Sequence, residues 1–169
     1  MHCTVVAVTT DSKETKDGMG FDEQDLFDVG AKFDYVENFE DEGCYAERVS
    51  NFLERMERAG AMVDREAQSF TLTEDVVRRY FAGRYDALRE MVNRLTLDEF
   101  AGAYNPDSAS KGVDVWSLQN TIEDEFDDGI FENGAYRTLD SFMRHATSDM
   151  RHNKAPITYY VRGAVSVHY

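Results

Sequence analysis

The sequence is poor in the residues on which disulfide scaffolds and membrane anchors depend. Its 169 residues include two cysteines, two prolines and one tryptophan, and 18 Lys and Arg stand against 33 Asp and Glu. Cys3 and Cys44 are too few for a disulfide framework and are expected to stay reduced, although the sequence does not settle whether they pair. We expect no signal peptide before the apolar run 5–8, and no apolar stretch reaches the length of a membrane span. These absences predict a cytoplasmic protein.

Motifs for nucleotide, metal or nucleophile chemistry are also missing. There is no P-loop, GxGxxG or GxSxG pattern. Segment 124–135 fails as a calcium loop, because Phe126 and Ala135 occupy positions that need oxygen ligands. His145 and His152 share a helical face, but no CxxC accompanies them as a zinc site would need. We therefore predict no catalytic residue, no cofactor and no metal, and an enzyme with an unrecognised site remains an alternative.

The hydrophobic content is high enough for a folded chain. Hydrophobic residues make up 42% of the sequence and aromatic residues 12%, which a disordered acidic segment would lack. The length suits one domain with a substantial core. We predict a single compact domain over 1–169, with the acidic segment 17–47 as a partly mobile surface element.

Alternating and apolar runs predict a sheet that contains both ends of the chain. Residues 3–10 are apolar on both faces, as in a central strand. Residues 157–169 alternate, with the odd-numbered residues on one face, and this predicts a half-buried strand. Residues 61–72 are predicted to form a hairpin or a strand, and 31–39 to be extended. The fold class predicted is α+β, a small and mostly antiparallel sheet covered by about four helices.

Apolar residues at a spacing of 3.6 predict those helices. Their ranges are 43–59, 74–95, 115–128 and 136–152. Thr73 is the expected N-cap of the second, and its buried stripe is expected to run from Val77 to Leu95. Thr96 and Glu99 match a capping box that opens a further short element, and Gly60 is expected to end the first helix.

The negative charge is unevenly distributed. Residues 1–47 carry thirteen acids and three bases, residues 48–95 carry eight and nine, and residues 96–169 carry twelve and six. Two segments concentrate the acids: 17–47, with eleven acids and one base, and 123–128, with five acids in six residues. Rows of carboxylates about 5–7 Å apart on helix turns or strands can imitate a track of phosphates. This pattern predicts a surface that attracts basic proteins and repels nucleic acid and anionic membranes.

A small acidic protein with these two segments and no catalytic motif resembles the DNA-mimic inhibitors of phages and mobile elements, the anti-CRISPR and antirestriction proteins. The resemblance implies a non-enzymatic inhibitor that occupies a basic nucleic-acid-binding groove of a host defence complex, a CRISPR effector or a restriction system. The expected partner is a basic nucleic-acid-binding protein or ribonucleoprotein, with no direct binding of nucleic acid or membrane. The predicted contacts are Asp22, Glu23, Asp25, Asp28, Glu40, Asp41, Glu42, Glu123, Asp124, Glu125, Asp127 and Asp128.

Two other interpretations of the acidity stay open. The first is an acidic adaptor that binds a protein partner through aromatic residues such as Phe21, Phe27 and Tyr35. The second is a salt-adapted protein whose acids only solvate it, which the five Lys against thirteen Arg would also suit. The partner's identity, the acidic segment that binds it and the formation of a homodimer are not decided by the sequence.

Overall fold

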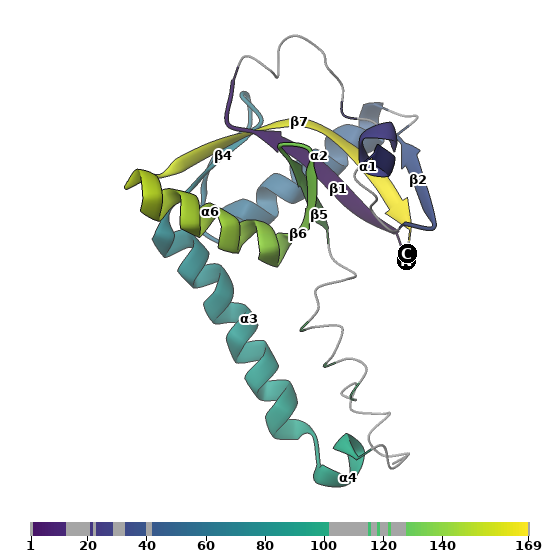
Figure 1. The fold of residues 1–169 in the computed structure, drawn as a ribbon, viewed down its shortest axis with the longest axis vertical. Coiled ribbons are helices and arrows are strands. Elements are labelled where there is room, and N and C mark those ends of the chain that lie inside the picture. Colours follow the sequence, from purple (N-terminus) through teal and green to yellow (C-terminus); the bar gives the residue numbers. More distant parts are fainter. Residues whose placement is uncertain are drawn as a thin grey trace.

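Five helices and seven strands form an α+β fold in the part of the chain that the structure describes (Figure 1). The structure is a computed structural model, and it describes residues 2–12, 21, 23–28, 33–39, 42–101, 115, 118, 122 and 128–168. In chain order the elements are β1 (His2–Thr9), α1 (Glu23–Asp28), β2 (Tyr35–Asn38), α2 (Glu42–Arg58), β3 (Met62–Asp64), β4 (Ser69–Leu72), α3 (Glu74–Arg94), α4 (Leu97–Phe100), β5 (Gly129–Glu132), β6 (Ala135–Thr138), α6 (Leu139–Asn153) and β7 (Ile157–His168).

The strands nearest the two ends of the sequence, β1 and β7, pair with each other at the centre of the sheet. The strand order is β3-β4-β7-β1-β5-β6, and only the β1–β5 pair is parallel. On the side away from β1, β7 pairs with β4 along 157–160 and with β2 along 165–168. The predicted α+β class, with a mostly antiparallel sheet that holds both end strands, is therefore confirmed.

A β-bulge in β7 changes which of its residues share a face. The pairing register with β1 shifts between Ala7 and Val8, and Arg162 is the extra residue in β7. Tyr159 therefore packs on one face of the sheet, whereas Val165 packs on the other. The prediction that all odd-numbered residues from 157 to 169 share a face is wrong beyond the bulge. The second half of β7 is also covered on both faces rather than half-buried.

The sheet divides the core into two clusters. The larger cluster lies under α2, α6 and the start of α3. At its centre the rings of Phe52, Phe142 and Tyr159 surround Phe70 at 5.5, 6.4 and 5.5 Å. The smaller cluster lies on the opposite face, where α1 contributes the fully buried Leu26. Both faces of the central strands are thus removed from water, as their continuous apolar sequence requires.

Local signals place the helix ends correctly. The Thr73 hydroxyl accepts a hydrogen bond from the Val76 N–H at 3.2 Å, as expected of an N-cap. The Thr96 hydroxyl accepts from the Glu99 N–H at 3.3 Å, and the Glu99 carboxylate accepts from the Thr96 N–H at 2.7 Å. The predicted capping box is therefore confirmed. Gly60 follows α2 with φ of 93°, a left-handed conformation that suits glycine and ends the helix.

Helix α3 projects away from the sheet along most of its length (Figure 1). Only Val76 and Val77, in its first turn, are buried. The buried stripe predicted as far as Leu95 is therefore wrong beyond the first turns, and Val92 is 54% exposed. The apolar residues do recur at helical spacing, but contacts from α6 extend along α3 only as far as Arg84.

The segment before α6 is a strand where the sequence analysis predicted helix. Strands β5 and β6 form a hairpin, and its turn residues Asn133 and Gly134 have φ of 51° and 71°. Two positive φ values define a type I′ turn, for which Asn-Gly is the preferred sequence. The predicted helix 136–152 consequently begins only at Leu139, after the N-cap Thr138. The predicted hairpin within 61–72 is confirmed by β3 and β4, and the predicted extended segment 31–39 by β2.

The helix predicted over 115–128 lies largely outside the described residues. Of its positions, Val115, Leu118, Ile122 and Asp128 are described. The first three are helical, whereas Asp128 is not, so the predicted helix ends before that residue. None of the described helices combines the length and the apolarity that a bilayer crossing requires.

Candidate functional site

Three segments carry an acidic surface. Helix α1 and the stretch 33–39, which contains β2, lie at one end of the sheet. The first turns of α2 continue this surface toward the middle of β7, where Tyr45 lines a cleft together with Val161 and Arg162. The described carboxylates of these three segments are Asp25, Asp28, Asp34, Glu37, Glu42 and Glu47, and all but the half-buried Asp25 are exposed. The described residues between 21 and 47 include no Lys or Arg. We call these six carboxylates the acidic surface.

Apolar side chains hold these segments in place and leave the carboxylates outside. Helix α1 buries Leu26, and β2 buries Val36 in the same cluster while it pairs with the end of β7. The rings of Phe39 and Tyr45 lie 6.5 Å apart in an edge arrangement, which connects the end of β2 to the first turns of α2. The alternation of aromatic and acidic residues in the sequence is therefore only in part an alternation between core and surface, because Phe27 and Tyr35 are exposed.

Few positive charges face this surface in the described part of the chain. His168 Nδ1 lies 4.0 Å from a carboxylate oxygen of Asp34, and Arg48 is an exposed residue of α2. Within α1 the Gln24 amide donates to Asp28 at 2.8 Å, which orients that carboxylate without neutralising it. The acidic surface therefore keeps most of its negative charge.

Asp128 belongs to the second acidic segment but lies at the same end of the sheet. Its Oδ1 accepts the Thr4 N–H at 3.0 Å, and its Oδ2 lies 3.6 Å from a guanidinium nitrogen of Arg55. Thr4 pairs with Ser166 of β7, and Ser166 pairs with Glu37 of β2. Asp128 and Glu37 are thus separated by about three strand spacings, roughly 14 Å. The parallel pairing of β1 with β5 is what places Asp128 on the same row of the sheet as Glu37.

The predicted contact residues divide into three groups. Asp25, Asp28 and Glu42 lie on the acidic surface, and Asp128 lies at the same end of the sheet with intramolecular partners. Glu23 is the first residue of α1, and its side chain is not described. The residues outside the described ranges are Asp22, Glu40, Asp41, Glu123, Asp124, Glu125 and Asp127. The prediction that segment 17–47 is partly mobile concerns several residues outside those ranges.

The aromatic residues proposed for an adaptor are not equivalent. Phe21 is 8% exposed and its ring lies 4.9 Å from Phe131, so it belongs to the core. Phe27 is 52% exposed and Tyr35 49% exposed, both among the acids. Phe21 is therefore wrong as a contact residue, whereas Phe27 and Tyr35 are available to a partner.

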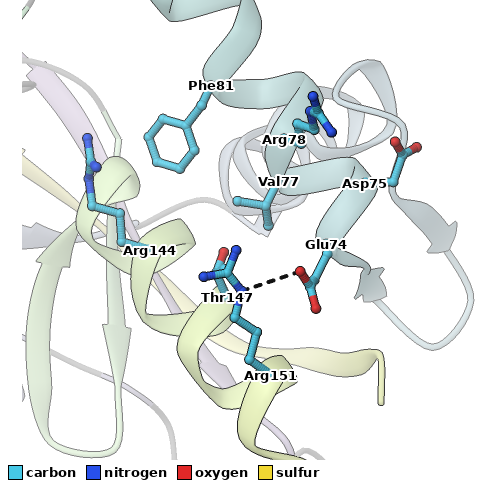
Figure 2. Close-up of a pocket in the computed structure, with 8 residues that line it drawn as sticks. All are labelled: Glu74, Asp75, Val77, Arg78, Phe81, Arg144, Thr147 and Arg151. Atoms are coloured by element: carbon cyan, nitrogen blue, oxygen red, sulfur yellow. Dashed lines mark hydrogen bonds and ion pairs between the residues drawn. The ribbon is translucent and has the colours of Figure 1, made fainter. Parts of the chain in front are cut away.

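A groove between α3 and α6, which the sequence analysis did not anticipate, has a volume of about 640 Å³. The Arg144 guanidinium lies 4.6 Å from the centre of the Phe81 ring, and Arg151 lies 3.4 Å from a carboxylate oxygen of Glu74 (Figure 2). Arg78 also lines the groove. Arg144 and Arg151 lie two turns apart on α6, but Arg78 belongs to α3, so no local pattern could have revealed the groove between the two helices. All three arginines are exposed, and the neighbouring acids reduce the positive charge of the groove.

Several features of the described residues bear on metal and thiol chemistry. In the ranges that the structure covers, no three His, Cys, Asp or Glu side chains are grouped so that they could hold a metal ion. Cys3 is buried and Cys44 half-buried, and no disulfide joins the two. A comparison with protein-family models, curated proteins and solved structures finds no match in any of the three. Function must therefore be inferred from the charges, clefts and exposed side chains of the chain itself.

Proposed function

We propose that this chain is a non-enzymatic inhibitor that occupies the basic nucleic-acid-binding groove of another protein by presenting a substitute for nucleic-acid charge. The observation that carries the proposal is that Asp128, the one described residue of the second acidic segment, lies on the same row of paired strands as Glu37 of the first segment. Helix α1 contacts β2 beside that row. Charges 80 or more residues apart thereby form one surface.

The geometry of this surface suits charge recognition. Its carboxylates stand on a helix, a strand and a helix start that are anchored in the core, so little ordering is needed when a partner binds. An extended negative field accelerates association with a basic groove and rejects acidic competitors. The resemblance to DNA-mimic inhibitors makes a CRISPR effector or a restriction complex in the cytoplasm the class of target that we propose.

The aromatic adaptor is the second candidate, and the exposure of Phe27 and Tyr35 favours it. A partner that binds mainly through these rings would lose affinity when they are replaced and would be largely insensitive to salt. The inhibitor proposed here makes the opposite prediction, because its affinity comes from carboxylates. The two candidates can therefore be separated with the same purified protein.

The test starts with a pull-down from a lysate of the native host at low salt, followed by elution in a salt gradient and mass spectrometry. Affinity for the captured protein is then measured for a variant with Asp25→Asn, Asp28→Asn, Glu37→Gln and Glu42→Gln. The matched control neutralises four exposed acids on α3 and α4: Asp75→Asn, Asp86→Asn, Glu90→Gln and Asp98→Asn. Both variants change the net charge by the same amount, so a difference between them reports the location of the charge.

We expect a nucleic-acid-binding complex that is released by moderate salt and competed by DNA or RNA. Four lost surface contacts should weaken its binding roughly 30-fold, and the control variant should change it less than about threefold. Equal weakening by the two variants would contradict a localised site. A partner that survives high salt, ignores nucleic acid and is lost with Phe27→Ala and Tyr35→Ala would establish the adaptor instead.

A further inference from the structure

A second cleft lies at the end of the central strands opposite to β2. Thr9 pairs with Tyr160 at this end, whereas His2 pairs with His168 at the end where β2 lies. The cleft has a volume of about 420 Å³, within the range of small-molecule sites. Its lining residues are Thr10, Glu132, Asn133, Asp149, Asn153, Pro156, Ile157, Thr158, Tyr159 and Tyr160.

Glu132 is a buried carboxylate in the lining of this cleft. It is the last residue of β5, it is 3% exposed, and its Oε2 has no hydrogen-bond partner. The nearest cation is Arg137, whose guanidinium nitrogen lies 3.9 Å from Oε2, beyond hydrogen-bond distance. A buried acceptor without a donor is costly, and native proteins place such groups where a ligand or a functional role uses them.

The charges around Glu132 leave the cleft negative. Asp149 of α6 is a second carboxylate in the lining, and no Lys, Arg or His lines the cleft. Behind the lining, His145 Nε2 lies 3.5 Å from a carboxylate oxygen of Asp149. Burial raises the pKa of the Glu132 carboxyl, and Arg137 and His145 act in the opposite direction while Asp149 adds to the increase. The local charge is therefore incompletely balanced.

We propose that this cleft binds a small primary amine as its alkylammonium ion, with Glu132 as the charged acceptor. An ammonium group brings one positive charge and three N–H donors. The acceptors available to it are the carboxylates of Glu132 and Asp149 and the side-chain oxygens of Asn133 and Asn153. The apolar surface for the carbon chain comes from Pro156 and Ile157 of the same lining.

A metal ion fits this cleft less well than an organic cation. Calcium needs six to eight oxygen ligands, most of them carboxylates or carbonyls held around one point. The described residues contain no group of three potential ligands suited to a metal, in this cleft or elsewhere. An ammonium ion needs only two or three acceptors, and its attached chain occupies the remaining volume. Because none of the six carboxylates of the acidic surface lines the cleft, this site is independent of the proposed inhibitor function.

The test is a titration of the full chain with n-butylammonium chloride, followed by ¹H–¹⁵N NMR at pH 7.5. Tetramethylammonium chloride keeps the ionic strength constant, because it carries the same charge but has no N–H donor. The variants are Glu132→Gln, Asp149→Asn and the control Glu54→Gln, an exposed acid on α2. The Asp149 variant keeps the test decisive if Glu132→Gln perturbs the fold, since Asp149 is partly exposed.

We expect saturable shifts of the Asn133 and Asn153 side-chain amides, caused by butylammonium and not by tetramethylammonium. Affinity should fall at least tenfold in Glu132→Gln and severalfold in Asp149→Asn, and should be unchanged in Glu54→Gln. Shifts spread over the acidic surface, identical responses to the two cations, or wild-type affinity in both cleft variants would each overturn the proposal.

Discussion

Replacement of Asp140 by alanine should loosen the attachment of α3 to the rest of the molecule. Asp140, in the first turn of α6, accepts a hydrogen bond from the Tyr80 hydroxyl at 2.7 Å. The same oxygen lies 2.9 Å from Nε of Arg84, and the side chains of Arg84 and Asp140 are only 20% and 15% exposed. Beyond the buried first turn of α3, this pair of contacts joins the projecting helix to α6.

The expected cost follows from the kind of contacts that are lost. A hydrogen bond that involves a charged group is worth about 1.5–3 kcal/mol, and a carboxylate in a first helical turn adds about 0.3–1 kcal/mol. The two bonds share one oxygen, and Arg84 can reach water once its partner is gone, so the sum is not fully realised. We expect Asp140→Ala to lower the free energy of unfolding by about 2–4 kcal/mol.

Urea denaturation followed by circular dichroism measures this loss. A double-mutant cycle with Arg84→Ala should return a coupling energy of about 1–2 kcal/mol for the pair. The control Glu90→Ala breaks an exposed pair with Arg94 on the same helix and should cost less than about 0.5 kcal/mol. A loss below about 1 kcal/mol for Asp140→Ala, or a coupling energy near zero, would refute this account of how α3 is held.

Three further predictions concern stability. Phe70→Ala should cost about 3–5 kcal/mol in urea denaturation, because Phe70 is fully buried among three other rings; a loss below about 2 kcal/mol would contradict its central place. Thr73→Ala should cost about 1 kcal/mol by the same measurement through loss of the N-cap, and Thr73→Ser should restore most of it. Burial raises the pKa of the Glu132 carboxyl above its value in the unfolded chain, so the folded state binds the proton more tightly. Wild-type stability should therefore decline as the pH rises from the pKa of the unfolded chain through the higher pKa of the folded protein. Glu132→Gln should lack this decline, and parallel pH–stability curves for the two proteins would contradict the prediction.

The parts of the fold that were predicted from the sequence depend on local signals. Thr73 and the Thr96–Glu99 capping box act within four residues, and the apolar runs of β1 and β7 require burial whatever their partners. The bulge at Arg162 could not be predicted, because it arises from the register between two strands that are far apart in the sequence. The helix predicted over 136–152 overlaps strand β6, although Asn133-Gly134 is a strong hairpin signal, because the apolar residues of 136–152 also fit a helical spacing.

The candidate site likewise combines features that local sequence predicts with features that depend on long-range contacts. The acidic segments were evident from composition, but the approach of Asp128 to β2 depends on the parallel β1–β5 pairing. The burial of Phe21 could not be distinguished from the exposure of Phe27 by residue type alone. In the sequence Glu132 is one acid among 33. Its burial and its raised pKa result from the packing of α6, β6 and β7 around it.

The central pairing of β1 with β7 has a consequence for how the chain folds. Val5 pairs with Val165, 160 positions later in the sequence, so the middle of the sheet depends on a contact of very long range. Such contacts require a large loop to close before they stabilise anything, and they slow folding. During synthesis β1 leaves the ribosome long before β7 exists, and its apolar faces stay without their native partner until that moment. Helix α2 and the β3–β4 hairpin contact one another over short sequence separations, so this unit can form before either central strand is paired.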